Sequence, residues 1–249
     1  MTDDRAVSEV VGFILVFSII LGTISFVYVG GFTGLQDTRD HEQLANAERA
    51  FDVLANNFED IGLNKAPSRA TEIKLADARI TVRDNGRMSI NATSLATAAT
   101  ARPRPIVYDA GGDTQIVYEN GAVIREDGDS AVMLREPDFI FNSERTVLRY
   151  IEPRGGSESV SGSTTVLVRA EESHSRLLAS VAEPNTVTLN FSTTPNRAPV
   201  WESYFEAELD DLGGDCTINE SGSDIAQIDC EFETNYLHVA RSRLWVDVT

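Results

Sequence analysis

The sequence predicts an α+β protein: a long N-terminal transmembrane-plus-stalk helix, then an antiparallel β-rich, sandwich-like domain over residues 70–249 with one short helix near 199–212. Three observations predict it. Residues 10–29 carry no charge, an apolar stripe with helical spacing follows to about residue 61, and the remaining chain alternates short Val-, Ile- and Thr-rich runs with turn residues.

Residues 10–29 are twenty consecutive uncharged residues, the length that an α-helix needs to cross ~30 Å of hydrocarbon. A cleaved secretory signal would have an apolar core of ~7 to 15 residues after a basic start, whereas this start contains Asp3 and Asp4. A buried core helix is rarely apolar on every face for so long. We therefore expect insertion into membrane lipid at about residues 10–29 of a helix that spans 7–61.

The helix is expected to continue beyond the apolar run as an amphipathic stalk. Its stripe has gaps of three and four residues and consists of Leu44, Ala47, Phe51, Leu54, Phe58 and Ile61. Gly62 is a candidate C-cap, and Pro67 prevents the helix from resuming. The stripe must pack either on the chain's own domain or on sister helices.

The β-domain is predicted from two hairpins and further strands. Asp84-Asn85-Gly86 is expected to join strands at 80–82 and 88–90, and Asn120-Gly121 to join 115–118 and 122–124, because Asn-Gly favours a type I′ turn. Further strands are expected at 146–151, 164–169, 186–191, 225–232 and 236–248. Pro199 opens the short helix and Gly213-Gly214 ends it, while 101–105 and 155–162 are expected as loops.

The composition is acidic, with 39 Asp and Glu against 21 Lys and Arg and a net charge of −18, and Lys65 and Lys74 are the only lysines. We expect no nucleic-acid binding, because the sequence contains no cluster of basic residues. An acidic surface suits either a cation-binding protein or a protein adapted to high salt, where screening suppresses self-repulsion. We favour the halophilic interpretation because the acids are spread along the chain.

Two cysteines, Cys216 and Cys230, are expected to form a disulfide worth ~3 kcal/mol outside a reducing compartment. The alternative is a pair of free thiols; their spacing fits no zinc site. The histidines, His41, His174 and His238, stand in no catalytic or metal-binding pattern, and nucleotide-binding motifs are absent. We predict no enzymatic activity, no catalytic residues, no cofactor and no metal.

Residues 4–12, DRAVSEVVG, followed directly by the apolar helix, resemble the start of archaeal type IV pilins and pilin-like proteins, particularly haloarchaeal ones. The resemblance implies that residues 1–6 are a leader peptide removed by a prepilin peptidase. Asp4 and Arg5 would be its charged pair, Ala6 the residue before the cut and Val7 the new N-terminus.

One residue departs from the pattern, because haloarchaeal pilins commonly have proline where this chain has Glu9. The Glu9 carboxylate is expected either to pair with the N-terminal amine of a sister subunit during assembly or to sit at the level of the lipid headgroups.

The resemblance also implies a single-pass protein of the cell membrane whose C-terminal domain is extracellular, an expectation that fits the cysteine pair. Three N-x-S/T sequons, at Asn91, Asn190 and Asn219, are possible glycosylation sites. The leading prediction is a pilin-like structural or interaction protein, a pilus-like subunit or minor pilin serving assembly, adhesion or surface organisation. The alternative is a monomeric single-pass protein with a ligand- or partner-binding extracellular β-domain.

Overall fold

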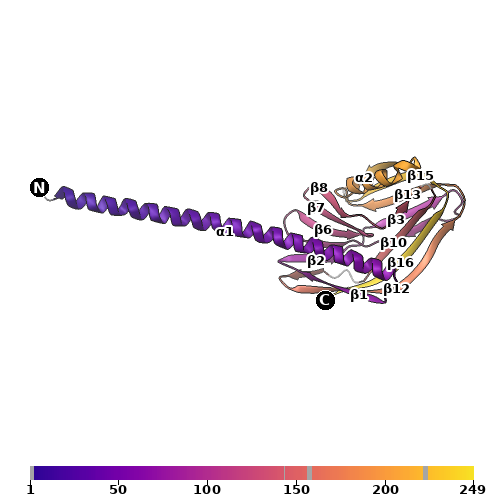
Figure 1. Ribbon diagram of the computed structural model, residues 1–249, viewed down its shortest axis with the longest axis horizontal. Helices are drawn as coiled ribbons and strands as arrows, with labels where there is room; N and C mark the ends of the chain where they lie inside the picture. The colour runs from indigo at the N-terminus through magenta and orange to yellow at the C-terminus, as the bar shows by residue number, and fades with distance from the viewer. Residues whose placement is uncertain (1–2, 143, 156–158, 221–223) are drawn as a thin grey trace. The chain divides into compact units, whose positions relative to one another are not determined.

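The computed structural model describes residues 3–142, 144–155, 159–220 and 224–249, with the side chains of 3–9, 31–37 and 220 outside the description (Figure 1). The chain forms two compact units, Met1–Ala45 and Asn46–Thr249. Helix α1 (Asp3–Gly62) contributes all of the described part of the first unit, and its last turns belong to the second.

Helix α1 ends at Gly62, and the chain turns at Lys65 beyond it. The helix ends at Gly62, as expected, but Lys65 takes the left-handed conformation with φ 61°, and the Ala66 N–H donates to the Asp60 carbonyl at 3.1 Å. This bond joins residues six positions apart, one more than the 6→1 bond of a Schellman motif, and Lys65 adopts a left-handed conformation that glycine usually takes.

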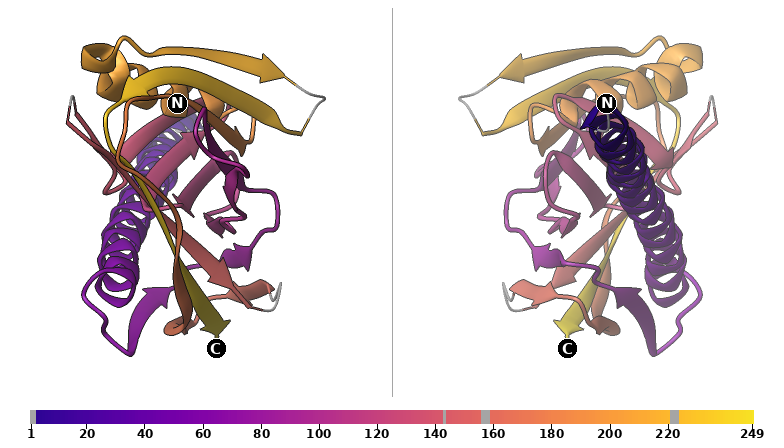
Figure 2. Two further views of the ribbon diagram at one scale, coloured as in Figure 1. Left: turned by 90° about the vertical axis from the view of Figure 1, so that its right-hand side faces the viewer. Right: turned by 90° about the vertical axis from the view of Figure 1, so that its left-hand side faces the viewer.

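The strands of the second unit form three sheets, which we call A, B and C (Figure 2). Sheet A has the order β1 (Ser68–Lys74), β12 (Thr165–Val181), β16 (Leu237–Val248), β10 (Thr146–Arg154), β9 (Ile140–Phe141). Sheet B has the order β11 (Ser159–Gly162), β2 (Ala78–Val82), β5 (Ile106–Asp109), β6 (Thr114–Glu119), β7 (Ala122–Asp127), β8 (Ser130–Arg135). Sheet C has the order β14 (Asp215–Glu220), β15 (Ala226–Thr234), β13 (Asn185–Thr193), β3 (Arg87–Ala92), β4 (Ala99–Ala101).

The α+β class is confirmed, and the strand pairs of the described residues are antiparallel except for β10 with β16, which is parallel. Helix α2 (Ala198–Leu209) and the short η1 (Asp210–Leu212) supply the helix predicted near 199–212, and Gly213 closes it with φ 62°. The predicted sandwich-like domain is rich in strands, as expected, but its strands form three sheets around one core and not two facing sheets.

The main core lies where α2 and sheet C meet the ends of sheets A and B. Its largest side chains are aromatic: Trp201 and Phe205 stack at 5.5 Å between ring centroids, and Phe191 of β13 lies 4.4 Å from Trp201. Full burial of such rings contributes most of the apolar stabilisation available to a domain of this size.

The two Asn-Gly hairpins have opposite outcomes. β6 and β7 pair antiparallel around Asn120 (φ 48°) and Gly121 (φ 99°), as predicted for a type I′ turn. The predicted hairpin 80–82/88–90 is wrong, because β2 pairs with β11 and β5 in sheet B while β3 pairs with β13 and β4 in sheet C. Gly86 lies on the crossing between the sheets, where an added Cβ would come within 2.1 Å of the Pro103 carbonyl oxygen.

The five further strands predicted from the sequence all exist, and each is longer than or shifted slightly from its predicted range. The 155–162 loop is wrong in part, because β11 occupies Ser159–Gly162 and pairs with β2 at the edge of sheet B. The sequence did not predict the first strand, β1, or the short strands β4, β5, β8, β9 and β14, because their sequence signals are weak.

Candidate functional site

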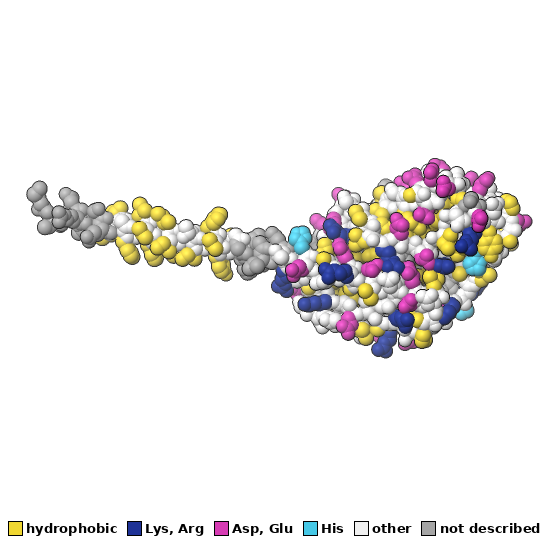
Figure 3. All heavy atoms as spheres, in the orientation of Figure 1, with side chains coloured by type: hydrophobic (Ala, Val, Ile, Leu, Met, Phe, Trp, Pro, Cys, Tyr) yellow, Lys and Arg dark blue, Asp and Glu magenta, His cyan; other side chains and the backbone are white. Residues whose placement is uncertain are grey.

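The first unit presents an uninterrupted apolar helix surface. Residues Val10–Gly30 have a mean hydropathy of 2.7, and none of this span is buried against the rest of the protein. Phe13 is 70% exposed and Phe26 81%, and yellow apolar side chains line this span on the face that Figure 3 shows. The chain therefore has one N-terminal helix that is long and apolar enough to cross a membrane.

The residues of the predicted processing site lie at the start of this helix. Asp4, Arg5, Ala6 and Val7, together with Glu9, fall within the range of α1, but their side chains are outside the described part of the structure. Cleavage after Ala6 and the pairing of Glu9 stay predictions.

The amphipathic stripe packs on the chain's own domain. Phe51 contacts Tyr108 of β5 edge to face at 6.2 Å between centroids, and Phe58 contacts Tyr118 of β6 at 5.0 Å. Phe51, Phe58 and Tyr118 are each at most 1% exposed. Of the two packing partners left open by the sequence, residues 46–62 use sheet B and need no sister helix.

Ion pairs fasten the same helix segment to sheet B. Arg135 of β8 donates from Nη1 to the Asp52 carboxylate at 2.7 Å and from Nη2 to Glu59 at 2.8 Å. Arg125 of β7 reaches Glu48 at 3.2 Å. These bonds fix the rotation of the helix about its axis, because Glu48, Asp52 and Glu59 flank the apolar stripe.

A buried ionic cluster joins sheets B and C. Arg197, which precedes α2 and is 1% exposed, lies between Glu119 (Nε–Oε2, 3.1 Å) and Glu126 (Nη1–Oε1, 2.5 Å). Trp201 Nε1 and Thr193 Oγ1 also donate to Glu119, both at 2.9 Å. Burial would lower the pKa of Arg197, but the two carboxylates outweigh it and raise the pKa above its ordinary value.

Every strong polar group of this cluster is satisfied by a neighbour within it, so the cluster positions α2 and is no open site. The sequence did not indicate it, because Glu119 and Arg197 are separated by 78 residues and neither belongs to a recognisable motif.

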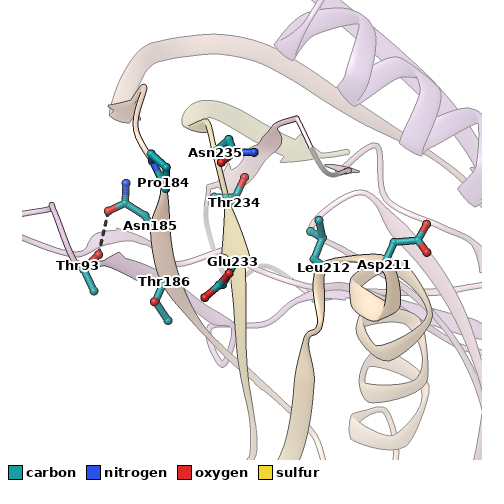
Figure 4. A pocket seen from close by; sticks show the side chains of 9 residues that line it. All are labelled: Thr93, Pro184, Asn185, Thr186, Asp211, Leu212, Glu233, Thr234 and Asn235. Atoms are coloured by element: carbon teal, nitrogen blue, oxygen red, sulfur yellow. Dashed lines mark hydrogen bonds between the residues drawn. The ribbon is translucent and has the colours of Figure 1, made fainter.

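One polar hollow opens at the end of sheet C (Figure 4). It is lined by Thr93, Pro184, Asn185, Thr186, Asp211, Leu212, Glu233, Thr234 and Asn235. Asn185 is already engaged, since its Oδ1 accepts from Thr93 Oγ1 at 3.1 Å and from the Ser94 N–H at 2.9 Å. The carboxylates of Asp211 and Glu233 point away from one another in Figure 4, so they do not converge on a substrate position.

The three histidines lie apart. His41 and His174 are exposed, and His238 stacks on Tyr236 at 6.4 Å between ring centroids. Within the described residues, no group of three or more His, Cys, Asp or Glu side chains is placed to hold a metal ion.

The cysteine pair and the sequons lie on sheet C. Cys216 of β14 and Cys230 of β15 are directly opposite and form the predicted disulfide, with Cα atoms 4.1 Å apart. The amides of Asn190 and Asn219 both donate to Asp229, at 2.6 and 2.8 Å, whereas Asn91 is exposed on β3. A glycan could be added at Asn91 without breaking such a bond, and the third residue of the Asn219 sequon lies outside the described residues.

These features define a class: an α+β protein with an N-terminal helix fit for a membrane and a disulfide-linked β-rich domain. The chain belongs to a family of unknown function, DUF7289, whose sequence profile matches residues 5–247. The match covers the apolar helix and the β-domain together, so both are parts of one family unit. No curated protein and no solved structure matches the chain.

Proposed function

We propose that this protein is a pilin-like, membrane-anchored structural or interaction protein of the cell surface, a type IV pilus-like subunit or minor pilin without enzymatic activity. The observation that carries the proposal is the contrast between the two units: residues 10–30 expose apolar side chains on every face, while the β-domain buries its own core and the stripe of residues 46–62. An exposed apolar helix of this length requires lipid or other apolar helices around it.

Three further features support the proposal. The DRAVSEVVG start fits processing by a prepilin peptidase, with Val7 as the mature N-terminus and Glu9 near the new amine. The Cys216–Cys230 disulfide fits an oxidising, extracellular location for the domain. The charge of −18, with arginine in most ion pairs, fits a surface adapted to high salt in an archaeal host.

The first experiment determines the mature N-terminus of the native membrane protein by mass spectrometry, with an Ala6→Val variant as control. A start at Val7 that disappears in the variant is the expected result. An intact or Met-trimmed N-terminus in the natural chain would remove the pilin-like assignment and leave an ordinary membrane anchor.

A second candidate is a monomeric single-pass protein whose extracellular β-domain binds a ligand or partner. It is favoured by the packing of the stalk, because Phe51 and Phe58 are satisfied by sheet B and leave no unpaired stripe for a sister stalk.

Disulfide cross-linking in native membranes separates the two candidates. Both natural cysteines are already bonded, so single cysteines placed at Ile14, Phe17 and Leu21 report contacts of the apolar helix, and Val53→Cys, 49% exposed on the domain, is the matched control. Assembly predicts cross-linked dimers from helix positions and none from Val53. Monomers at every position would favour the second candidate.

A further inference from the structure

An arginine-rich patch occupies one face of sheet A, in a protein whose net charge is −18. The register places Tyr150, Arg241 and Arg176 side by side on β10, β16 and β12, and two residues along β16 it places Glu152, Arg243 and His174. Residues two apart on a strand share a face, so both rows point to the same side of the sheet. Arg154 follows on β10.

The patch has more positive than negative charge. Glu152, 1% exposed, is paired with Arg154 at 2.6 Å, with Arg243 at 2.5 Å and with Arg241 at 3.6 Å. Its Oε1 also accepts the Arg102 backbone N–H at 2.9 Å. One carboxylate thus serves three guanidinium groups, and Arg176 has no ion pair among the described residues.

Arg241 is the unsatisfied member. Its side chain is 10% exposed, its Nε has no hydrogen-bond partner in the described residues, and the distance of 3.6 Å to Glu152 is too long for a hydrogen bond. A buried N–H donor without an acceptor is unfavourable, and the Arg241 Nε–H is such a donor.

The neighbours of Arg241 increase this penalty. Arg176 lies directly across from it, and like charges opposite one another in a sheet are destabilising. Burial and the charges of Arg243, Arg176 and Arg154 outweigh the attraction of Glu152, so the pKa of Arg241 is below its ordinary value. A bound anion would offset this repulsion and give Arg241 a second counter-charge beside Glu152.

We propose that this patch, formed by Arg241 with Arg176 and Arg243, binds a tetrahedral oxyanion of the phosphate or sulfate class. Arg176 and Arg241 are opposite one another on β12 and β16, and Arg243 lies two residues along β16 on the same face. Three neighbouring guanidinium groups match the several oxygens of a tetrahedral anion better than the two oxygens of a carboxylate. Arginine forms charge-assisted, often bidentate bonds with such oxygens.

The test is isothermal titration calorimetry of the full chain in a neutral detergent, with inorganic sulfate and phosphate as probes. Ionic strength is held constant with potassium chloride so that general screening cancels. We expect saturable binding of sulfate and phosphate that is much tighter than binding of acetate. Glycerol phosphate is a further probe: binding as tight as that of phosphate indicates an oxyanion carried as an ester, as in a lipid headgroup, and weaker binding indicates a free ion.

Arg176→Gln is the decisive variant, because Arg176 is exposed and has no ion pair within the described ranges, so its replacement should leave the fold intact. Sulfate affinity should fall roughly tenfold, the effect of one charge-assisted bond. The thermal midpoint without sulfate should rise, because the repulsion with Arg241 is relieved.

Arg169→Gln is the matched control, since Arg169 lies on the same strand opposite Asp247, about 20 Å along the sheet from the Arg176 row. Its sulfate affinity should stay within about twofold of the natural chain, well inside the effect of one bond. An absence of saturable heat, or equal weakening in the two variants, would overturn the proposal.

Discussion

At the scale of single residues, Asn120 joins all three sheets. It forms the β6–β7 turn of sheet B, its Nδ2 donates to Met88 Sδ of sheet C at 3.2 Å, and its Oδ1 accepts the Ile151 backbone N–H of sheet A at 3.1 Å. Position 120 therefore requires both a residue that tolerates a positive φ, here 48°, and a buried side-chain amide that forms these bonds.

Two substitutions separate the backbone requirement from the side-chain requirement. Asn120→Gly keeps the turn accessible but leaves the Ile151 N–H unpaired, so we expect a loss of about 2 kcal/mol in the free energy of unfolding. Asn120→Ala should lose about 1 kcal/mol more, because a Cβ disfavours this backbone conformation. Urea unfolding followed by tryptophan fluorescence measures both. Equal losses would show that the backbone conformation is unimportant.

Glu152 makes the stability depend on pH in the acid range. Burial alone would raise its pKa, but the bonds from Arg243 and the Arg102 N–H and the charge of Arg154 hold the pKa below the ordinary 4.5. A depressed carboxyl pKa contributes stability that is present above the unfolded-state value and is lost as the pH falls through the folded-state value.

Glu152→Gln should therefore destabilise the protein by about 3 kcal/mol at pH 7, because three arginines lose their counter-charge. The difference from the natural chain should shrink as the pH falls below 4.5, where the natural Glu152 also becomes neutral. Thermal unfolding between pH 3 and 7 measures this. Glu231→Gln, an exposed acid without an ion pair in the described residues, is the control, and a pH-independent difference for Glu152→Gln would contradict the assignment.

At the scale of elements, apolar packing holds the last turns of α1 to sheet B. The exposed face of the same helix contributes little to the free energy of unfolding. Phe58→Ala removes a ring that is 1% exposed and should cost about 3 to 5 kcal/mol, through lost transfer energy and the cavity left at Tyr118. Val53→Ala, on the exposed face of the same helix, should change the free energy of unfolding by less than about 0.5 kcal/mol. Comparable losses in urea unfolding would mean that the stripe is not the docking face.

The elements also show what the sequence can specify. Apolar spacing located the stripe of α1, and the stop signals Gly62 and Pro67 located its end to within a residue, because both are local properties of the sequence. Strand pairing is not local: Asn85-Gly86 and Asn120-Gly121 have the same turn chemistry, yet only the second makes a hairpin. β2 pairs with β11 and β5 and not with β3, and these partners are distant from it in the sequence.

The same limit applies to the polar clusters. The disulfide was predictable because two cysteines allow one pairing. The Glu119–Arg197 cluster and the patch around Arg241 arise from residues on separate strands that only the register brings together. The arginines of these clusters belong to no sequence motif, so the sequence did not indicate them. The apolar helix of residues 10–30 was predictable, because its hydropathy depends on composition alone.

At the scale of the whole molecule, the unit boundary after Ala45 precedes Ala47, the first fully buried residue of the stripe. A chain of residues 46–249 should therefore keep every core contact of the β-domain and lose only the exposed apolar helix. Its net charge should keep it soluble.

Fractionation of expressing cells tests this division. We expect the full chain in the membrane fraction, and residues 46–249 in the aqueous supernatant with a cooperative thermal transition. A chain of residues 63–249 is the matched control: it uncovers Tyr108 and Tyr118 on sheet B and should aggregate or unfold, because a large apolar face is left in water. Recovery of residues 46–249 with the membranes would show that the β-domain itself binds lipid, and the helix of residues 10–30 would no longer explain membrane attachment.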